Sequence, residues 1–117
     1  MEGISHEVAS FAGHLKLNKL IVFFDDNGIS IAGPVNLANS ENTSERFKAY
    51  GWNTIKINGH KPKEIIQSIK KAQRSKKPTL ISCKTKIGFG SPNKQGKSSV
   101  HGSPPVSYTH LTLPTKA

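Results

Sequence analysis

The chain has 117 residues, which is enough for one modest domain but short for a complete multidomain enzyme, so its length allows either a small single domain or a fragment of a longer protein. No stretch approaches the roughly 18 apolar residues of a membrane span. No basic segment followed by an apolar one indicates a secretion signal. We therefore expect a soluble chain with no membrane partner.

The formal net charge of +10 is unevenly distributed along the chain. Residues 1–50 carry four Lys or Arg against six Asp or Glu, whereas residues 51–117 carry thirteen against one. Seven of these thirteen lie between Lys61 and Lys77, in a segment with helical periodicity. A polyanion would suit such a surface. Because no aromatic residues are interleaved and no nucleic-acid-binding motif is present, we interpret the run as a solvated helix face. A basic nucleic-acid-binding module stays as a rival hypothesis.

The first expected element is a helix over Glu2 to Leu17, because apolar residues recur there on one helical face, namely Ile4, Val8, Phe11, Ala12 and Leu15. The run from Leu20 to Phe24 follows. It is too short for a helix and rich in strand-forming residues, so it predicts a strand buried on both faces, as in a parallel sheet.

The next segments continue this alternation. A short helix is expected in SERFKAYG, where Gly51 is placed to end it, and NTIKIN alternates like a strand. A second long helix is predicted to begin at Pro62 and to stop before Pro78, with an apolar stripe of Ile65, Ile66, Ile69 and Ala72. Thr79 to Cys83 is the third expected strand, with Cys83 as a small core residue. The pattern predicts an α/β fold with a parallel β-sheet flanked by helices.

Ligands of such sheets collect at the carboxyl ends of the strands. The first strand ends in Asp25, Asp26 and Asn27, and the carbonyls around Gly28 and Ile29 add further oxygen donors. A hard cation such as Mg²⁺ takes ligands of this kind. The alternative is a simple turn with Gly28 at positive φ, and from the residues alone that alternative is favoured.

The third strand is followed by the loop IGFGSPNKQGK. Its glycines expose backbone N–H groups beside lysines, a composition suited to binding an anion, although a flexible surface loop is the alternative. His101 lies beyond this loop and could contact phosphate or move a proton, although a lone loop histidine is usually just solvated. Spacing alone supports no Ser/His/Asp arrangement and no Cys/His metal cluster.

Four segments in order resemble the diphosphate-binding domain of transketolases: MEGISHEVASFAGHLKLNKLIVFFDDNGISIAG, RFKAYGW, KPTLISCKTKIGFGSPNKQG and SVHGSP. The resemblance runs from Met1 to about Pro104. It implies the thiamine diphosphate-binding fold and transfer of a two-carbon ketol unit from a ketose phosphate to an aldose phosphate. Thiamine diphosphate and a divalent cation, Mg²⁺ or else Ca²⁺ or Mn²⁺, are the implied cofactors. Related thiamine enzymes, dihydroxyacetone synthase and deoxyxylulose phosphate synthase, are the nearer alternatives.

The family pattern assigns roles to five positions. It makes Asn27 a side-chain ligand of the cation and a cofactor contact, and Ile29 a ligand through its backbone carbonyl. His101 matches the histidine that contacts the cofactor diphosphate and the incoming sugar, and is the candidate catalytic residue. Ile87 matches an apolar residue beside the cofactor. Glu2 matches a glutamate near the interface of a homodimer.

Other features depart from the family or lie outside the resemblance. Ala32 stands where an aspartate is common, which puts the local turn in doubt. In the family, the third protein ligand of the metal precedes the MEGIS-like segment. The family's catalytic glutamate comes from a different domain, which is absent here. We therefore expect this chain alone to be inactive. Residues 1–105 are interpreted as a partial diphosphate-binding domain. Residues 106–117 are interpreted as a translated sequencing-adapter tail. The expected location is cytoplasmic, or plastid in a photosynthetic eukaryote.

Overall fold

The computed structural model describes residues 3–30, 33–34 and 41–102. These residues fall into two compact units. The first comprises the described residues up to Asp26 together with 41–84, and the second comprises those from Asn27 to Pro34 together with 85–102. No helix in the described part of the chain is long and apolar enough to cross a membrane.

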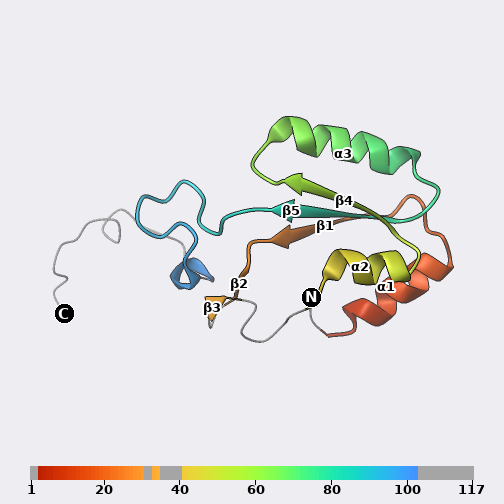
Figure 1. Cartoon of the computed structure of the whole chain (residues 1–117), viewed down its shortest axis with the longest axis horizontal. Coiled ribbons are helices and arrows are strands. Elements are labelled where there is room, and N and C mark those ends of the chain that lie inside the picture. Colours follow the sequence, from red (N-terminus) through yellow and green to blue (C-terminus); the bar gives the residue numbers. More distant parts are fainter. Residues whose placement is uncertain (1–2, 31–32, 35–40, 103–117) are drawn as a thin grey trace. The chain divides into compact units, whose positions relative to one another are not determined.

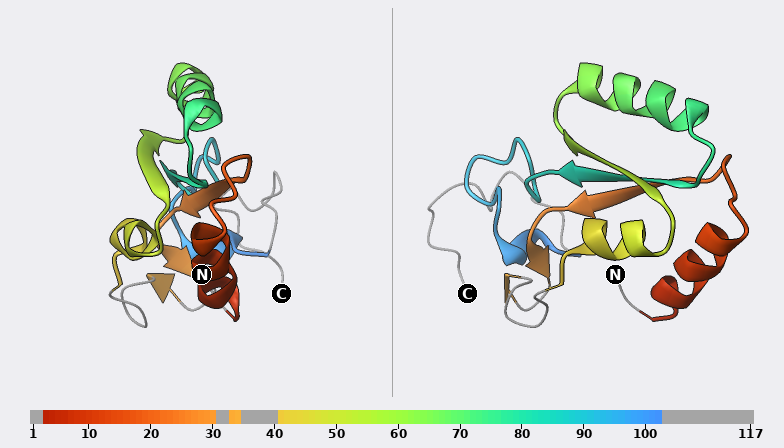
Figure 2. Two further views of the ribbon diagram at one scale, coloured as in Figure 1. Left: turned by 90° about the vertical axis from the view of Figure 1, so that its right-hand side faces the viewer. Right: turned by 45° about the vertical axis from the view of Figure 1, so that its right-hand side comes forward.

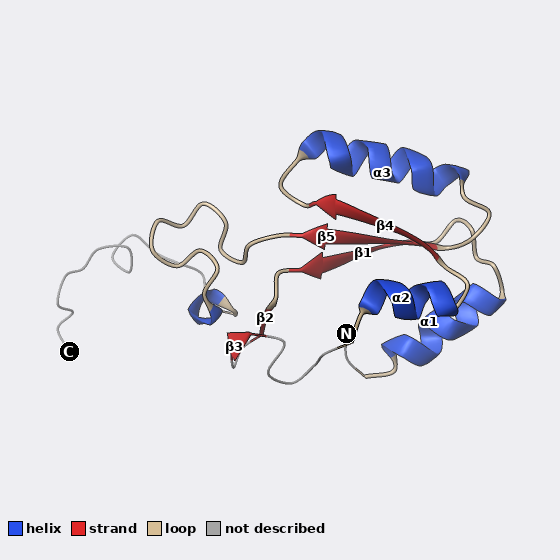
Figure 3. Cartoon of the chain, viewed as in Figure 1, coloured by secondary structure: helices blue, strands red, loops and turns tan. Residues whose placement is uncertain are grey.

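The first unit is built on a three-stranded parallel sheet (Figures 1 and 3). Its strands are β1 (Ile21–Asp26), β4 (Asn53–Asn58) and β5 (Thr79–Lys84), in the spatial order β1-β5-β4. Phe23 and Ile55 both lie opposite Ile81 of the central strand. The predicted α/β fold with a parallel sheet is therefore confirmed.

Helices cover both faces of this sheet (Figure 2). Helix α3 (Pro62–Arg74) lies on one face, and helices α1 (Ser5–His14) and α2 (Thr43–Ala49) lie on the other. The central strand β5 supplies the core on both sides: Leu80 packs with the α1 and α2 layer, and Ile81 packs with α3. Successive side chains of a strand point to opposite faces of the sheet. Leu80 and Ile81 therefore contact different helical layers.

Local signals in the sequence set the ends of α2 and α3, as predicted for Gly51 and Pro62. The Asn42 side chain caps α2 by accepting a hydrogen bond from the Glu45 backbone N–H at 3.1 Å. Gly51, at φ +91°, follows the end of that helix in the left-handed conformation that glycine tolerates. Pro62 begins α3, where its missing N–H has no helical partner to lose.

The predicted apolar face of α1 was wrong for its large residues, although the helix itself is present and Ala12 of that face is buried. The large apolar residues of that face are exposed, namely Ile4, Val8, Phe11 and Leu15. The buried residues are Ala9, Ala12 and Gly13, whose small size lets the helix backbone approach the chain around Trp52. The Trp52 indole Nε1–H donates to the Ala9 carbonyl at 2.8 Å, which fixes this close packing.

Two further burial predictions need correction. Strand β1 was expected to be buried on both faces, but Phe23 is 48% exposed because β1 is an edge strand in the described sheet. Ile66 was placed in the apolar stripe of α3, but it is 53% exposed. Ile69 and Ala72 do pack against the sheet, and buried Cys83 lies with them.

The second unit contains little regular structure. Strands β2 (Ile29–Ser30) and β3 (Gly33–Pro34) form a short antiparallel pair, with Ile29 opposite Pro34. The 3-10 helix η2 (Ser98–Val100) lies near the end of the described chain.

Candidate functional site

Both predicted site loops leave the sheet at the same edge. Strands β1 and β5 are parallel, and their register ends with Asp26 opposite Lys84. The loop that begins at Asn27 and the loop that begins at Thr85 therefore start from adjacent strand ends. This edge is where parallel α/β sheets bind ligands.

Asp25 and Asp26 belong to β1 rather than to the loop, opposite Cys83 and Lys84 of β5. Gly28 follows at φ +71°, the backbone conformation that the turn alternative requires. Asn27 is half-buried at that turn.

The Cys83 thiol lies beside this edge but is not a reactive group. Burial raises the pKa of Cys83 above its ordinary value, and the negative charge of Asp25 raises this pKa further. The thiol therefore stays protonated at neutral pH, whereas a cysteine nucleophile reacts as the deprotonated thiolate. Its role is to fill the core under α3.

The loop after β5 is closed by its own hydrogen bonds. The Gly96 N–H donates to the Ile87 carbonyl at 2.6 Å, and the Ser91 N–H donates to the Gly88 carbonyl at 2.9 Å. The Gly90 N–H donates to Oε1 of Gln95 at 3.0 Å. The loop is therefore a folded, internally bonded structure, and not merely a flexible connection.

Glycine is required at Gly88. Its φ is +66°, and a Cβ at this position would lie 3.1 Å from Cγ2 of Val100. Val100, buried in η2, thus packs against the glycine-rich stretch and brings the end of the loop back to its beginning. His101 follows η2 directly, is exposed, and donates its backbone N–H to the Ser98 carbonyl at 2.9 Å.

The charge of this loop is uniformly positive. Residues 85–102 contain Lys86, Lys94 and Lys97 and no Asp or Glu. Three lysines with no competing carboxylate suit an anionic ligand. The predicted free N–H groups are not found at Gly90 and Gly96, because both donate inside the loop. In the described residues, no group of three or more His, Cys, Asp or Glu side chains could hold a metal ion by itself.

Four of the five predicted site residues belong to the second unit: Asn27, Ile29, Ile87 and His101. Ile87 is half-buried, and its carbonyl is engaged by Gly96. The ligand roles of these four residues stay predictions. Glu2, Ala32 and residues 106–117 lie outside the described residues.

Sequence reasoning missed two residues that shape the loop. Gln95 accepts the Gly90 N–H, and Val100 packs against Gly88. Val100 carried a weak signal, because it is a lone apolar residue in the polar stretch before His101. Gln95 carried none, because its partner is decided by how the loop closes.

Residues 1–108 match the family described as transketolase, thiamine diphosphate binding domain. The chain belongs to the transketolase family. Its match includes the whole described fold and both loops of the candidate site.

Individual transketolases show the same similarity. The chain is 56% identical over 105 residues to the transketolase of Staphylococcus aureus, a match that covers 89% of this chain and 16% of that protein. The crystal structure of Campylobacter jejuni transketolase superposes with a TM-score of 0.84 at 44% identity, covering 86% of this chain and 16% of the other. A Pichia stipitis transketolase solved with sedoheptulose-7-phosphate gives a TM-score of 0.82 at 43% identity, covering 86% and 15%. The chain thus spans 16% of the length of the curated transketolases that it matches.

Proposed function

We propose that the full-length protein from which this chain derives is a transketolase that moves a two-carbon ketol unit from a ketose phosphate to an aldose phosphate. The observation that carries the proposal is the match to the thiamine diphosphate-binding domain of transketolases over residues 1–108. Sugar phosphates are the proposed substrates, and the Pichia stipitis enzyme was solved with one of them, sedoheptulose-7-phosphate. The proposed active form is a cytoplasmic homodimer, with Glu2 near its interface.

The residues present fit the diphosphate end of the cofactor. The loop of residues 85–102 carries three lysines and no carboxylate, and it turns at glycines with positive φ, which suits two phosphate groups. Ile87 would contact the apolar part of the cofactor beside it. Bound thiamine diphosphate supplies the carbon-carbon bond chemistry that protein side chains cannot.

A divalent cation, Mg²⁺ by preference, would be held beside the diphosphate. The Asn27 side-chain oxygen and the Ile29 carbonyl are hard donors of the kind that Mg²⁺ selects. Two protein donors do not complete an octahedral site, so phosphate oxygens, water and a further protein carboxylate would supply the rest.

His101 is the proposed contact for both the cofactor diphosphate and the sugar. Its imidazole is exposed at the end of η2, where it can donate a hydrogen bond to a phosphate or hydroxyl oxygen. Orientation of the sugar, rather than bond breaking, is the role that we assign to it.

The test uses the full-length coding sequence recovered from the same source. The full-length enzyme should transfer ketol units with dependence on thiamine diphosphate and Mg²⁺. His101→Ala should lower kcat/KM by at least tenfold, whereas Ser99→Ala, an exposed neighbour in η2, should leave it unchanged. An enzyme that releases no ketol product from a ketose phosphate would overturn the proposal.

The 117-residue chain alone should show no turnover, because it spans 16% of the length of matched transketolases. Cofactor-dependent turnover by the purified chain would contradict this. We further propose that residues 1–105 are the transketolase part and that residues 106–117 are a translated adapter tail. A genomic reading frame that continues through Val106 with the same codons would reject the tail.

A further inference from the structure

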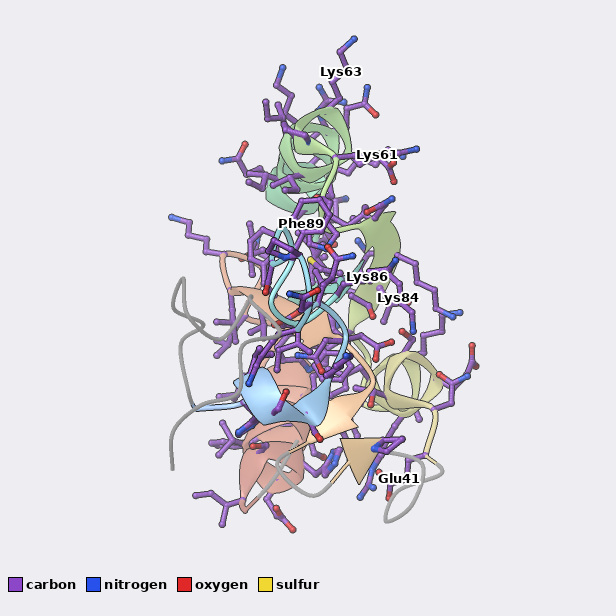
Figure 4. All side chains as sticks on the ribbon, turned by 90° about the vertical axis from the view of Figure 1, so that its left-hand side faces the viewer. Glu41, Lys61, Lys63, Lys84, Lys86 and Phe89 are labelled. Carbon is purple, nitrogen blue, oxygen red and sulfur yellow. The ribbon has the colours of Figure 1, made fainter. Side chains whose placement is uncertain are left out.

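The outer face of α3 carries an aligned row of basic and amide side chains. Lys63, Gln67, Lys70 and Arg74 recur at offsets of four, seven and eleven, and all four are exposed. They lie opposite Ser68 and Ala72, which are buried against the sheet. We call these four residues the basic stripe. Figure 4 shows Lys63 extending outward from the end of α3.

The stripe has no internal counter-charge. Among the described residues, no carboxylate lies within ion-pair distance of Lys63, Lys70 or Arg74. The one acidic residue of α3, Glu64, is half-buried and already occupied. Its Oε1 accepts the Asn58 backbone N–H at 3.1 Å, and its Oε2 lies 3.7 Å from Nζ of Lys61.

Further positive charge surrounds the stripe. Lys61, Lys71, Lys76 and Lys77 are all exposed on α3 or on its flanks. Residues 61–77 therefore present seven positive charges against one negative charge, on an element whose other side is fixed in the core. Such a concentration of positive charge attracts a polyanion.

The spacing of the stripe suits a chain of phosphates. At 1.5 Å per residue, Lys63 and Arg74 are separated by about 16 Å along the helix axis, with Lys70 between them. A nucleic-acid strand carries one phosphate charge per nucleotide, so a strand lying along this length presents several phosphates to the stripe. Gln67 fills the gap between Lys63 and Lys70 with an amide that can donate to a phosphate oxygen.

The same face is poorly suited to a membrane surface. The apolar side of α3 is used by the core, where Ile69 and Ala72 pack, so the helix has no apolar face to insert into lipid. Ile66 is the one large apolar residue of α3 that is exposed.

No aromatic residue lies on α3, so base stacking is absent from this surface.

We propose that the basic stripe of α3 binds the phosphate backbone of a nucleic acid without regard to base sequence. The inference is independent of the proposed ketol transfer, because α3 belongs to the first unit and the candidate cofactor residues belong to the second. It replaces the interpretation of residues 61–77 as a merely solvated face.

The test is a fluorescence anisotropy titration of the 117-residue chain with a labelled 12-nucleotide single-stranded RNA of mixed sequence, between 25 and 200 mM salt. A Kd of about 10⁻⁴ to 10⁻⁶ M is expected near physiological salt. Three phosphate contacts predict a slope of about −2 for log K against log salt concentration. A scrambled RNA of the same length should bind equally well.

The decisive comparison is between two triple charge reversals of equal net charge. Lys63→Glu, Lys70→Glu and Arg74→Glu together should weaken binding at least tenfold at 50 mM salt and remove most of the salt dependence. Reversal of Lys16, Lys19 and Lys56 to Glu, at exposed positions outside α3, changes the net charge equally and should retain most of the affinity. The triple Gln variant of Lys63, Lys70 and Arg74 covers the case in which the reversal does not fold, and circular dichroism checks each protein.

Equal losses in the two triple reversals would show a net-charge effect and overturn the proposal. No binding by the unchanged chain at 25 mM salt would also overturn it. Stripe-dependent binding to vesicles of anionic phospholipid, without binding to the RNA, would assign the surface to a membrane and reject the nucleic acid.

Discussion

Asp26 and Lys84 lie opposite each other as the last register pair of β1 and β5. They are far apart in the sequence, but the parallel pairing makes each the final strand residue before a candidate site loop. The oxygen-rich turn after β1 and the lysine- and glycine-rich loop after β5 therefore begin side by side. Parallel α/β sheets as a class bind their ligands at such carboxyl edges.

Replacement of Gly13 by alanine should destabilise the first unit. A Cβ at Gly13 would lie 1.9 Å from the Tyr50 carbonyl oxygen, a backbone atom that can move only with its chain. Overpacking of this kind costs about 1–3 kcal/mol. Urea denaturation of Gly13→Ala against the unchanged chain measures this loss.

The matched control for Gly13 is Ser10→Ala, an exposed position on the same helix. This substitution should change the free energy of unfolding by less than about 0.5 kcal/mol. A Gly13→Ala chain as stable as the Ser10→Ala chain would show that α1 does not pack closely on the Tyr50 backbone.

The fold was predictable wherever a local rule applied. Gly51 and Pro62 ended and began helices as expected, because their backbone preferences do not depend on distant residues. The buried face of α1 was not predictable in this way. Large apolar residues at helical spacing normally mark the core, but here Ala9 and Gly13 face inward because close backbone packing around Trp52 leaves room only for small residues.

The candidate site was predictable in its position but not in its internal geometry. Alternation of strands and helices was enough to place Asn27 and the 85–102 loop at one sheet edge. The contact of Gln95 with Gly90 could not be inferred, because it arises from the path of the closed loop. Likewise, the position of β1 at the edge of the described sheet, with Phe23 exposed, could not be predicted from the sequence.

The buried Cys83 thiol should make stability fall at alkaline pH. Its pKa is raised in the folded chain, first by burial and then by the charge of Asp25, from an ordinary value of 9.0. Below pH 9 the Cys83 thiol is protonated in both the folded and the unfolded chain, so its contribution to the free energy of unfolding is fully present. As the pH rises above 9, the unfolded chain releases the proton first, and this contribution is lost up to the higher folded pKa.

Urea denaturation between pH 7 and pH 10.5, on the unchanged chain and on Cys83→Ala, isolates this effect. Lysine and tyrosine titrations are common to both proteins, so the difference in unfolding free energy reports the thiol. This difference should shrink as the pH rises above 9. A constant difference over the whole range would contradict a raised pKa for Cys83.

Removal of the Asn27 amide should raise the Mg²⁺ concentration that the full-length enzyme requires. If Asn27 is a cation ligand as proposed, Asn27→Ala should raise the Mg²⁺ concentration for half-maximal activity by at least tenfold, the size of effect typical of weakened metal sites. Asp25→Asn is the matched control, because Asp25 is an exposed strand residue next to the same turn. An Asn27→Ala enzyme with the same Mg²⁺ requirement as the unchanged enzyme would remove Asn27 from the metal site.

Loss of the Gln95 carbonyl should weaken cofactor binding without slowing the loaded enzyme. Oε1 of Gln95 accepts the Gly90 N–H at 3.0 Å, and this contact holds the glycine-rich stretch of the loop in its bend. A hydrogen bond of this kind contributes about 0.5–1.5 kcal/mol, which corresponds to a roughly 2- to 12-fold change in affinity. In the full-length transketolase, Gln95→Ala should raise the Kd for thiamine diphosphate by this factor and leave kcat at saturating cofactor unchanged. Gln95→Glu keeps an acceptor oxygen at this place but adds a negative charge near the proposed diphosphate, so it should bind the cofactor more weakly than Gln95→Ala. If Gln95→Ala lowered kcat and left the Kd unchanged, Gln95 would act on the reaction itself and not through the shape of the loop.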